Sequence, residues 1–252
     1  MSSNRNEVKG LVGAVACALS VGAFVGSAQA DPVNATLSAT YFEVAHGTGG
    51  PDFGGSGTPN VAAGSSLGPD GLPVVVAGSE GISEFNPTTE EITWWSPTMN
   101  SAVQQTGTGT IALPYASNMY PPNSGGGSDS GGFETAMFSG NFSLATASTV
   151  SFQLGSDDDS FIYVDGTLIG QNPGIHGVTN VDFSSGVLGV GPHTLDVFFA
   201  DREETGAFLS LNLLSSGVVI TPSVPEPSSW GLLLAGLGLV GAVARRRRGG
   251  SN

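Results

Sequence analysis

The chain has 252 residues, 39 of them glycine and only one cysteine, and a formal net charge of −14 at pH 7. From Asp31 to Pro225 there are 19 acidic residues and a single basic one, which leaves an excess of 18 negative charges. Phosphate binding requires cations, so this balance excludes nucleic acid as a partner and disfavours an anionic lipid surface. The lone cysteine excludes a disulfide-stapled domain, a cysteine nucleophile in the exported part and a thiolate metal centre.

The N-terminus has the pattern of a secretory signal peptide over residues 1–30. A polar head with Arg5 and Lys9 precedes an apolar run from Leu11 to Val25. Ala28 and Ala30 then occupy the two positions that signal peptidase inspects. We therefore expect signal peptidase to cut after Ala30 during export.

Residues 31–215 are expected to form one extracellular domain, since about 185 residues are enough for a sizeable core. Apolar and polar side chains roughly alternate from Val33 to Val44, which predicts a first strand. Pro73–Val76 is a candidate for a second, short strand. Three further segments before residue 133 are expected to be loop, irregular or connecting chain: 46–71, 84–98 with Trp94 and Trp95, and 121–132.

The strand pattern sharpens after Phe133. Asp165-Gly166 lies between two β-rich runs and predicts a hairpin, because both central residues of such a turn take positive φ. Nothing in the domain carries a sustained helical period, so the sequence predicts an all-β fold, an antiparallel β-sandwich. The strands that support this prediction are 150–154, 160–164, 167–169, 194–199 and 207–213.

The C-terminus has the composition of a membrane-sorting tail. Residues 216–228 are expected to be a linker that contains Pro225, Glu226 and Pro227. Residues 229–252 contain an apolar run from Trp230 to Ala244, somewhat short against the about 20 residues of a relaxed bilayer span. Four arginines follow the run and should hold that end in the cytoplasm; they are Arg245, Arg246, Arg247 and Arg248. The tail is therefore expected to be a single transmembrane helix.

This tail resembles the PEP-CTERM sorting signal, in which a Pro-Glu-Pro motif, an apolar span and a terminal arginine cluster occur in this order. The resemblance implies that an integral-membrane exosortase cuts near the motif, after a transient stay in the inner membrane. It also implies a Gram-negative bacterium that makes exopolysaccharide. The expected location is the cell surface or the extracellular matrix.

An acidic loop is the candidate functional site. Asp157, Asp158 and Asp159 follow a predicted strand, and adjacent carboxylates with backbone carbonyls can supply several of the six to eight hard oxygens that calcium takes. The same residues can also be a solvated turn, because aspartate is a common turn residue. The single cation of the domain, Arg202, is expected to pair with Asp201, with Glu203 or with an aspartate across the sheet.

Residues 132–213 resemble the fibro-slime domain of bacterial surface proteins and, more distantly, the protective-antigen-type β-sandwich of flocculin adhesins. The resemblance implies that Asp157 and Asp158 chelate a calcium ion that also contacts sugar hydroxyls. A second ligand loop would run from Asp201 to Gly206, with Asp201 as a metal ligand and Arg202 beside the ligand, although its residues differ from the adhesin pattern. His176 lies where fibro-slime-like sequences also place histidine and would organise the loop beside the aspartates.

Three functions stay open. The leading hypothesis is a non-enzymatic surface or matrix protein that binds a glycan of the cell's exopolysaccharide with calcium as cofactor. The second is a purely structural matrix protein that associates with copies of itself. The third is a glycan-cleaving enzyme, for which no pair of acidic residues is singled out by the sequence.

Overall fold

The computed structural model describes residues 35–45, 52–54, 62–76, 79, 82–122 and 131–223, and these residues contain strands and turns but no α-helix. By its internal contacts the chain separates into Met1–Asp31 and Pro32–Asn252, and every described residue belongs to the second unit. The strands, in chain order, are β1 (Thr36–Ala45), β2 (Ala63–Leu67), β3 (Pro73–Val75), β4 (Val103–Ala112), β5 (Tyr115–Asn118), β6 (Gly132–Leu144), β7 (Ser151–Asp157), β8 (Asp159–Val164), β9 (Thr167–Asn172), β10 (Thr179–Ser184), β11 (Gly191–Ala200), β12 (Phe208–Leu213) and β13 (Ile220–Pro222).

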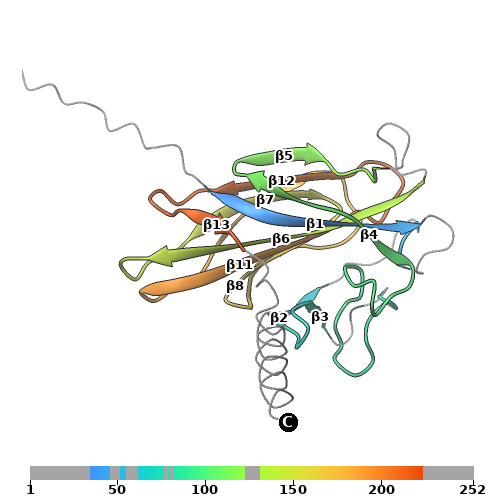
Figure 1. Ribbon diagram of the computed structural model, residues 1–252, viewed down its shortest axis with the longest axis horizontal. Coiled ribbons are helices and arrows are strands. Elements are labelled where there is room, and N and C mark those ends of the chain that lie inside the picture. The colour runs from blue at the N-terminus through green and yellow to red at the C-terminus, as the bar shows by residue number, and fades with distance from the viewer. Residues whose placement is uncertain are drawn as a thin grey trace, which may run out of the picture. The chain divides into compact units, whose positions relative to one another are not determined.

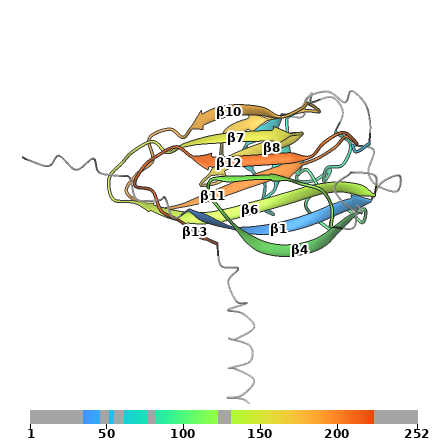
Figure 2. The same ribbon diagram turned by 90° about the horizontal axis from the view of Figure 1, so that it is seen from above.

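The strands form two sheets (Figure 1). The larger has the order β3-β2-β9-β8-β11-β6-β1-β4, with β13 also paired to β6, and the smaller has the order β10-β7-β12-β5. All these pairs are antiparallel. Figure 2 shows β10, β7 and β12 side by side in one layer and β11, β6, β1 and β4 in another. The predicted antiparallel β-sandwich is therefore confirmed.

The main core lies between the two sheets. Alternate residues of each strand point into it, because successive side chains of a strand face opposite ways. A single apolar cluster joins the two sheets. It contains Phe152 and Leu154 of β7, Val150 directly before β7, and Leu195 and Val197 of the larger sheet. This cluster fixes which face of β7 is internal, since a slip of one residue would turn these side chains to solvent.

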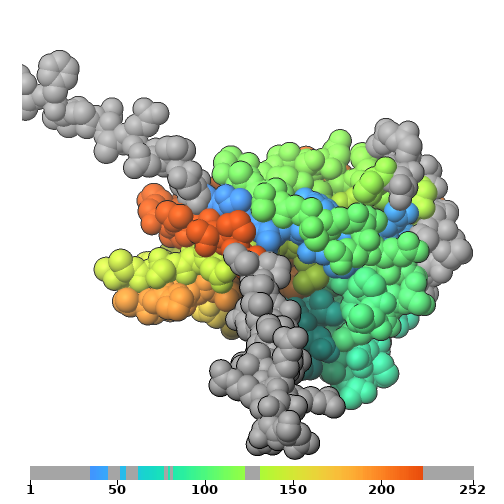
Figure 3. All heavy atoms as spheres, in the orientation of Figure 1, coloured from blue at the N-terminus to red at the C-terminus, as the bar shows by residue number. Residues whose placement is uncertain are grey.

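The opposite face of the larger sheet is also covered, at one end, by described residues between 52 and 102, a range that also contains the edge strands β2 and β3. We call the described residues of this range the cover segment. Its Trp94 and Trp95 pack with Phe161, Tyr163 and Phe198 in a second apolar cluster. Every residue of β8 is consequently buried, as expected of a strand that is apolar on both faces. Figure 3 shows the teal and green atoms of this part of the chain at the end away from β13.

Several predicted elements are found where the sequence placed them. The alternation of 150–154 is β7, and the apolar run of 160–164 is β8. Asp165 and Gly166 have φ values of 52° and 70°, as the predicted hairpin requires. In β11, Leu195 enters the main core and Phe198 enters the second cluster, on opposite faces.

Two expectations need correction, and one strand was not predicted at all. Residues 63–67, expected to be loop, form β2, which pairs with β3 and β9. Residues 103–112, which no pattern marked, form β4 at the edge of the larger sheet, where its exposed polar side chains produce no apolar alternation. Residues 220–222 lie in the expected linker but form β13 against Gly140–Phe142 of β6, so the folded domain extends beyond residue 215.

Candidate functional site

The three consecutive aspartates lie where the chain passes from one sheet to the other. Asp157 ends β7 in the smaller sheet, and Asp159 begins β8 in the larger one. Asp158 is the single residue between them, and the Asp157–Asp158 peptide bond is cis. The predicted acidic loop is thus a one-residue connection between the two sheets, and two of its three aspartates are buried.

Asp158 binds two loops through their backbones. Its side chain is only 1% exposed. Oδ1 accepts a hydrogen bond from the His176 amide at 2.9 Å. Oδ2 accepts from the amides of Arg202 at 2.8 Å and Glu203 at 3.1 Å. Burial raises the pKa of this carboxyl group, while these amide bonds favour its ionised form and act against the rise. Asp158 therefore ties the loops around residues 173–177 and 201–206 to the sheet junction.

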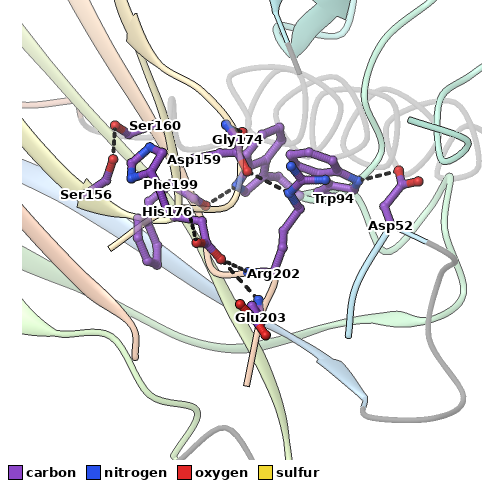
Figure 4. A network of polar contacts seen from close by, with 12 residues as sticks. Asp52, Trp94, Ser156, Asp159, Ser160, Gly174, His176, Phe199, Arg202 and Glu203 are labelled. Atoms are coloured by element: carbon purple, nitrogen blue, oxygen red, sulfur yellow. Dashed lines mark hydrogen bonds and ion pairs between the residues drawn. The ribbon is translucent and has the colours of Figure 1, made fainter. Parts of the chain in front are cut away.

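Asp159 and Arg202 form a buried ion pair. Both side chains are 0% exposed, and Nε of Arg202 lies 2.6 Å from Oδ2 of Asp159. Oδ1 of Asp159 accepts a hydrogen bond from the Gly174 amide. Burial raises the pKa of the Asp159 carboxyl group, and the adjacent guanidinium opposes that rise. The expected pairing of Arg202 with an aspartate across the sheet is therefore found, and that aspartate is Asp159 (Figure 4).

The guanidinium of Arg202 also lies over the ring of Trp94, with Cζ 4.9 Å from the ring centroid. The Trp94 indole N–H donates to Oδ2 of Asp52 at 3.0 Å. Asp52 additionally accepts from the amide and the hydroxyl of Ser83, each at 2.8 Å, and from the Glu84 amide at 3.0 Å. A continuous polar network therefore runs from the sheet junction through Arg202 into the cover segment (Figure 4). Within the described residues, Nη1 and Nη2 of Arg202 have no hydrogen-bond partner.

The other sequence-predicted residues lie around this network. Asp201 is fully buried, and its amide donates to the Glu134 carbonyl at 3.0 Å. Asp157 is half-buried beneath Gly206, where an added Cβ would lie 3.0 Å from Oδ2 of Asp157. Gly206 also has φ +110°, so both backbone conformation and space favour glycine there. His176 reaches the aspartates through its backbone, and its Nδ1 lies 3.0 Å from the Gly177 carbonyl oxygen.

The side chains around the junction match calcium in donor type but not in number. Carboxylate oxygens are the hard ligands that calcium prefers. Oδ2 of Asp158, however, already accepts two amide bonds. Among the residues that the structure describes, no group of three or more histidine, cysteine, aspartate or glutamate side chains is arranged to hold a metal ion. The set Asp157, Asp158 and Asp201 is therefore not a complete cage, and calcium binding stays a prediction.

The targeting residues lie outside the described part of the chain. They are Ala28, Ala30, Pro225, Glu226, Pro227, Arg245, Arg246, Arg247 and Arg248. Within the described residues there is no helix of the length and hydropathy that a bilayer crossing requires. The signal peptide and the transmembrane helix consequently stay predictions.

Comparison with known proteins supports the predicted sorting signal. The family model of the PEP-CTERM protein-sorting motif matches residues 223–248, which confirms the resemblance of the tail. A motif of this kind indicates export to the cell surface. The Gram-negative source and the transient anchor in the inner membrane are not tested by this match. No curated protein is similar enough in sequence to match the chain.

Three solved structures of β-rich domains are similar in fold to this chain. A PA14 sugar-binding domain from an RTX adhesin is 14% identical, with 74% of this chain and 94% of that chain covered and a TM-score of 0.36. The PA14 domain of the antifreeze protein MpAFP is also 14% identical, with 79% and 96% covered and a TM-score of 0.34. The epithelial adhesin 9 A domain from Candida glabrata, in complex with Galβ1-4GlcNAc, is 9% identical, with 77% and 93% covered and a TM-score of 0.38. At such scores these likenesses assign no ligand.

Proposed function

We propose that the protein is a non-enzymatic surface protein that binds a glycan of its own cell's exopolysaccharide, with a calcium ion at the Asp157–Asp158 turn. Its export is indicated by the sorting motif. The observation that carries the proposal is an imbalance of buried charge at the sheet junction. Asp158 and Asp159 are both buried there, and Arg202, which pairs with Asp159, is the single lysine or arginine in the described part of the chain.

A divalent cation would correct this imbalance. Burial of a carboxylate costs free energy unless a cation or hydrogen bonds compensate for the lost water. Asp158 could reach an ion through Oδ1, which accepts one hydrogen bond, and Asp157 could reach it from its half-buried position. Backbone carbonyls and the hydroxyl groups of a sugar would complete the coordination shell. Calcium accepts such irregular sets of oxygen ligands.

A structural role is the second candidate, and one observation favours it. Asp158 accepts three backbone hydrogen bonds, and Asp159 pairs with Arg202, so both side chains already hold the loops together. In that case the aspartates serve the fold alone, and the domain is a matrix component that packs against copies of itself.

Thermal unfolding in calcium and in chelator distinguishes the two candidates. At a hundredfold excess over Kd, calcium should stabilise the protein by about 2.7 kcal/mol, which corresponds to about 5–10 °C in Tm. Asp157→Asn should abolish the shift and, with it, the calcium-dependent part of exopolysaccharide retention in a pull-down. Asp182→Asn is the matched control, since Asp182 is an exposed aspartate of β10. Equal midpoints with and without calcium would leave the aspartates only their structural role. Release of reducing sugar would contradict the non-enzymatic assignment.

A further inference from the structure

The cover segment contains a hollow that the calcium proposal does not use. It has a volume of about 470 Å³, within the about 300–1,000 Å³ typical of small-ligand sites. The chain returns on itself around this hollow, with Phe85 and Ile92 bridged and the Thr93 amide bonded to the Glu84 carbonyl. The side chains that carry the inference are Glu84, Phe85, Asn86 and Met99.

A fixed carboxylate and one donor without a good partner border the hollow. Oε1 of Glu84 accepts a 2.7 Å hydrogen bond from the side-chain amide of Asn100, which fixes the carboxylate. Oε2 of Glu84 is buried, and the Asp52 backbone amide adds a hydrogen bond that favours the ionised carboxylate. Among the described residues, the side-chain NH₂ of Asn86 donates to the Met99 sulfur alone, 4.0 Å away. A sulfur acceptor is weak, so this donor is available to a better one.

The side-chain positions are fixed before any ligand arrives. Oδ1 of Asn86 accepts from the amides of Thr88 at 2.9 Å and Thr89 at 3.4 Å, which holds its NH₂ in one orientation. The Glu84 amide is bound to Asp52, whose carboxylate also holds the Trp94 indole. Preorganised groups of this kind lose little entropy on binding.

An apolar surface lies beside the polar pair. Phe85 is 36% exposed although it lines the hollow, and Met99 and Pro87 line it as well. A sugar ring presents C–H groups on its face and hydroxyl groups at its edge. Such a ring could cover Phe85, donate a hydroxyl hydrogen to Glu84 and accept from Asn86. Apolar walls with a few placed polar groups are typical of small-ligand sites.

The charge of the hollow restricts the class of sugar. Burial raises the pKa of the Glu84 carboxyl group, the hydrogen bond from Asn100 acts against the rise, and the negative charge of the nearby Asp52 adds to it. An anionic ligand would add like charge at short distance. A metal ion finds only one carboxylate in the lining.

We propose that the hollow formed by Glu84, Phe85 and Asn86 binds one neutral sugar unit of a glycan, without calcium. This site is separate from the Asp157–Asp158 turn and would be a second contact for the same class of ligand. It rests on the proposed function only in that the ligand is a glycan. Because the second site needs no metal, binding in chelator distinguishes it from the calcium site.

The experiment titrates the full exported protein with neutral tetrasaccharides of glucan, galactan and mannan, and with a tetramer of galacturonic acid, all in the presence of chelator. At least one neutral tetrasaccharide should bind, and the acidic tetramer should bind at least tenfold more weakly. Glu84→Gln and Phe85→Ala should each weaken the neutral ligand about tenfold, as expected for loss of one well-placed contact of about 1.4 kcal/mol. The two variants are used together because Glu84→Gln could misfold. Phe85 is partly exposed, so Phe85→Ala should fold as the parent does and still test the hollow. Asp182→Asn, at an exposed aspartate of β10, should bind as the parent does.

Three results would overturn the inference. The first is absence of binding to every neutral tetrasaccharide in chelator. The second is equal affinity for the acidic tetramer. The third is unchanged affinity in both pocket variants. If binding required calcium and Asp157, and both pocket variants bound as tightly as the parent, the proposed function would stand and the second site would fall. If binding in chelator depended on Glu84 and Phe85 but calcium changed neither Tm nor affinity, the second site would stand and the calcium proposal would fall.

Discussion

Glu134 should make the stability of the domain depend on pH near neutrality. It lies on β6, is 5% exposed and is directly opposite Glu43 of β1 in the strand register. Burial and, to a lesser extent, the charge of Glu43 raise the pKa of the Glu134 carboxyl group to about 8. The pKa of an unperturbed glutamate is about 4.3. The folded protein therefore holds a proton that the unfolded chain has already released.

The sign and size of the effect follow from this difference. Between the two pKa values the native state binds more protons than the unfolded state, so the free energy of unfolding falls as pH rises. The contribution is fully present below about pH 4 and is lost by about pH 8. Each unit of difference in pKa corresponds to about 1.4 kcal/mol, so the complete loss is about 4–5 kcal/mol.

The assay is urea unfolding of the parent protein and of Glu134→Gln at pH 5, 6, 7 and 8. The difference between the two isolates Glu134 from other buried carboxyl groups, such as Asp196, whose pKa burial raises to about 6. The parent should lose stability relative to the variant at every step. Glu43→Gln should move the loss of stability to lower pH, because it removes a repelling charge. Parallel profiles of parent and Glu134→Gln would refute the reasoning.

Three further predictions concern the ion pair, the packing of the sheets and the sorting tail. Arg202→Met should cost about 3–5 kcal/mol of unfolding free energy, because it leaves Asp159 buried without its cation; a chemical denaturation midpoint equal to that of the parent would contradict this. Gly140→Ala should lower the free energy of unfolding by about 1–3 kcal/mol, because the added Cβ would lie 2.5 Å from Leu37 and 2.6 Å from Ile220. The control is Gly107→Ala, whose added Cβ would have no atom within 4 Å. This control should change the free energy of unfolding by less than about 0.5 kcal/mol. Replacement of Pro225, Glu226 and Pro227 by alanine should leave the protein in the membrane fraction with its arginine tail attached, as mass spectrometry would reveal; unchanged surface delivery would contradict a sorting role for the motif.

The strands that the sequence predicts are those whose own side chains contact a core. In β7 and β12 the alternation of apolar and polar residues is set by burial of one face, and in β8 by burial of both. β4 shows no such pattern, because it lies at a sheet edge and its pairing depends on β1 rather than on its own composition. β13 is three residues long and likewise depends on its partner, β6.

The candidate site was predictable only in part, for a similar reason. Clustered aspartates after a strand are visible in the sequence, and the structure places them at the sheet junction. The role of Trp94 and Asp52 is not visible, because it arises from the packing of the cover segment against the larger sheet. The ion pair was predictable in kind, because the lone arginine of so acidic a domain is expected to pair with a carboxylate, but the sequence did not single out Asp159 as its partner. The hollow around Glu84 gave no signal, since its residues are ordinary turn residues.

The last strand that the structure describes, β13, lies directly before the sorting motif. Ser223 is the first residue of the matched motif, yet its amide donates to the Ser139 carbonyl at 3.3 Å and its hydroxyl accepts from the Asn141 side chain at 3.2 Å. The stretch from Pro222 to Pro225 can extend at most about 11 Å. An enzyme that cuts at this motif therefore meets its substrate with almost no spacer. Either its entrance accommodates a docked β-sheet, or β13 must detach from β6 before the cut, which would make surface release sensitive to the strength of a three-residue strand.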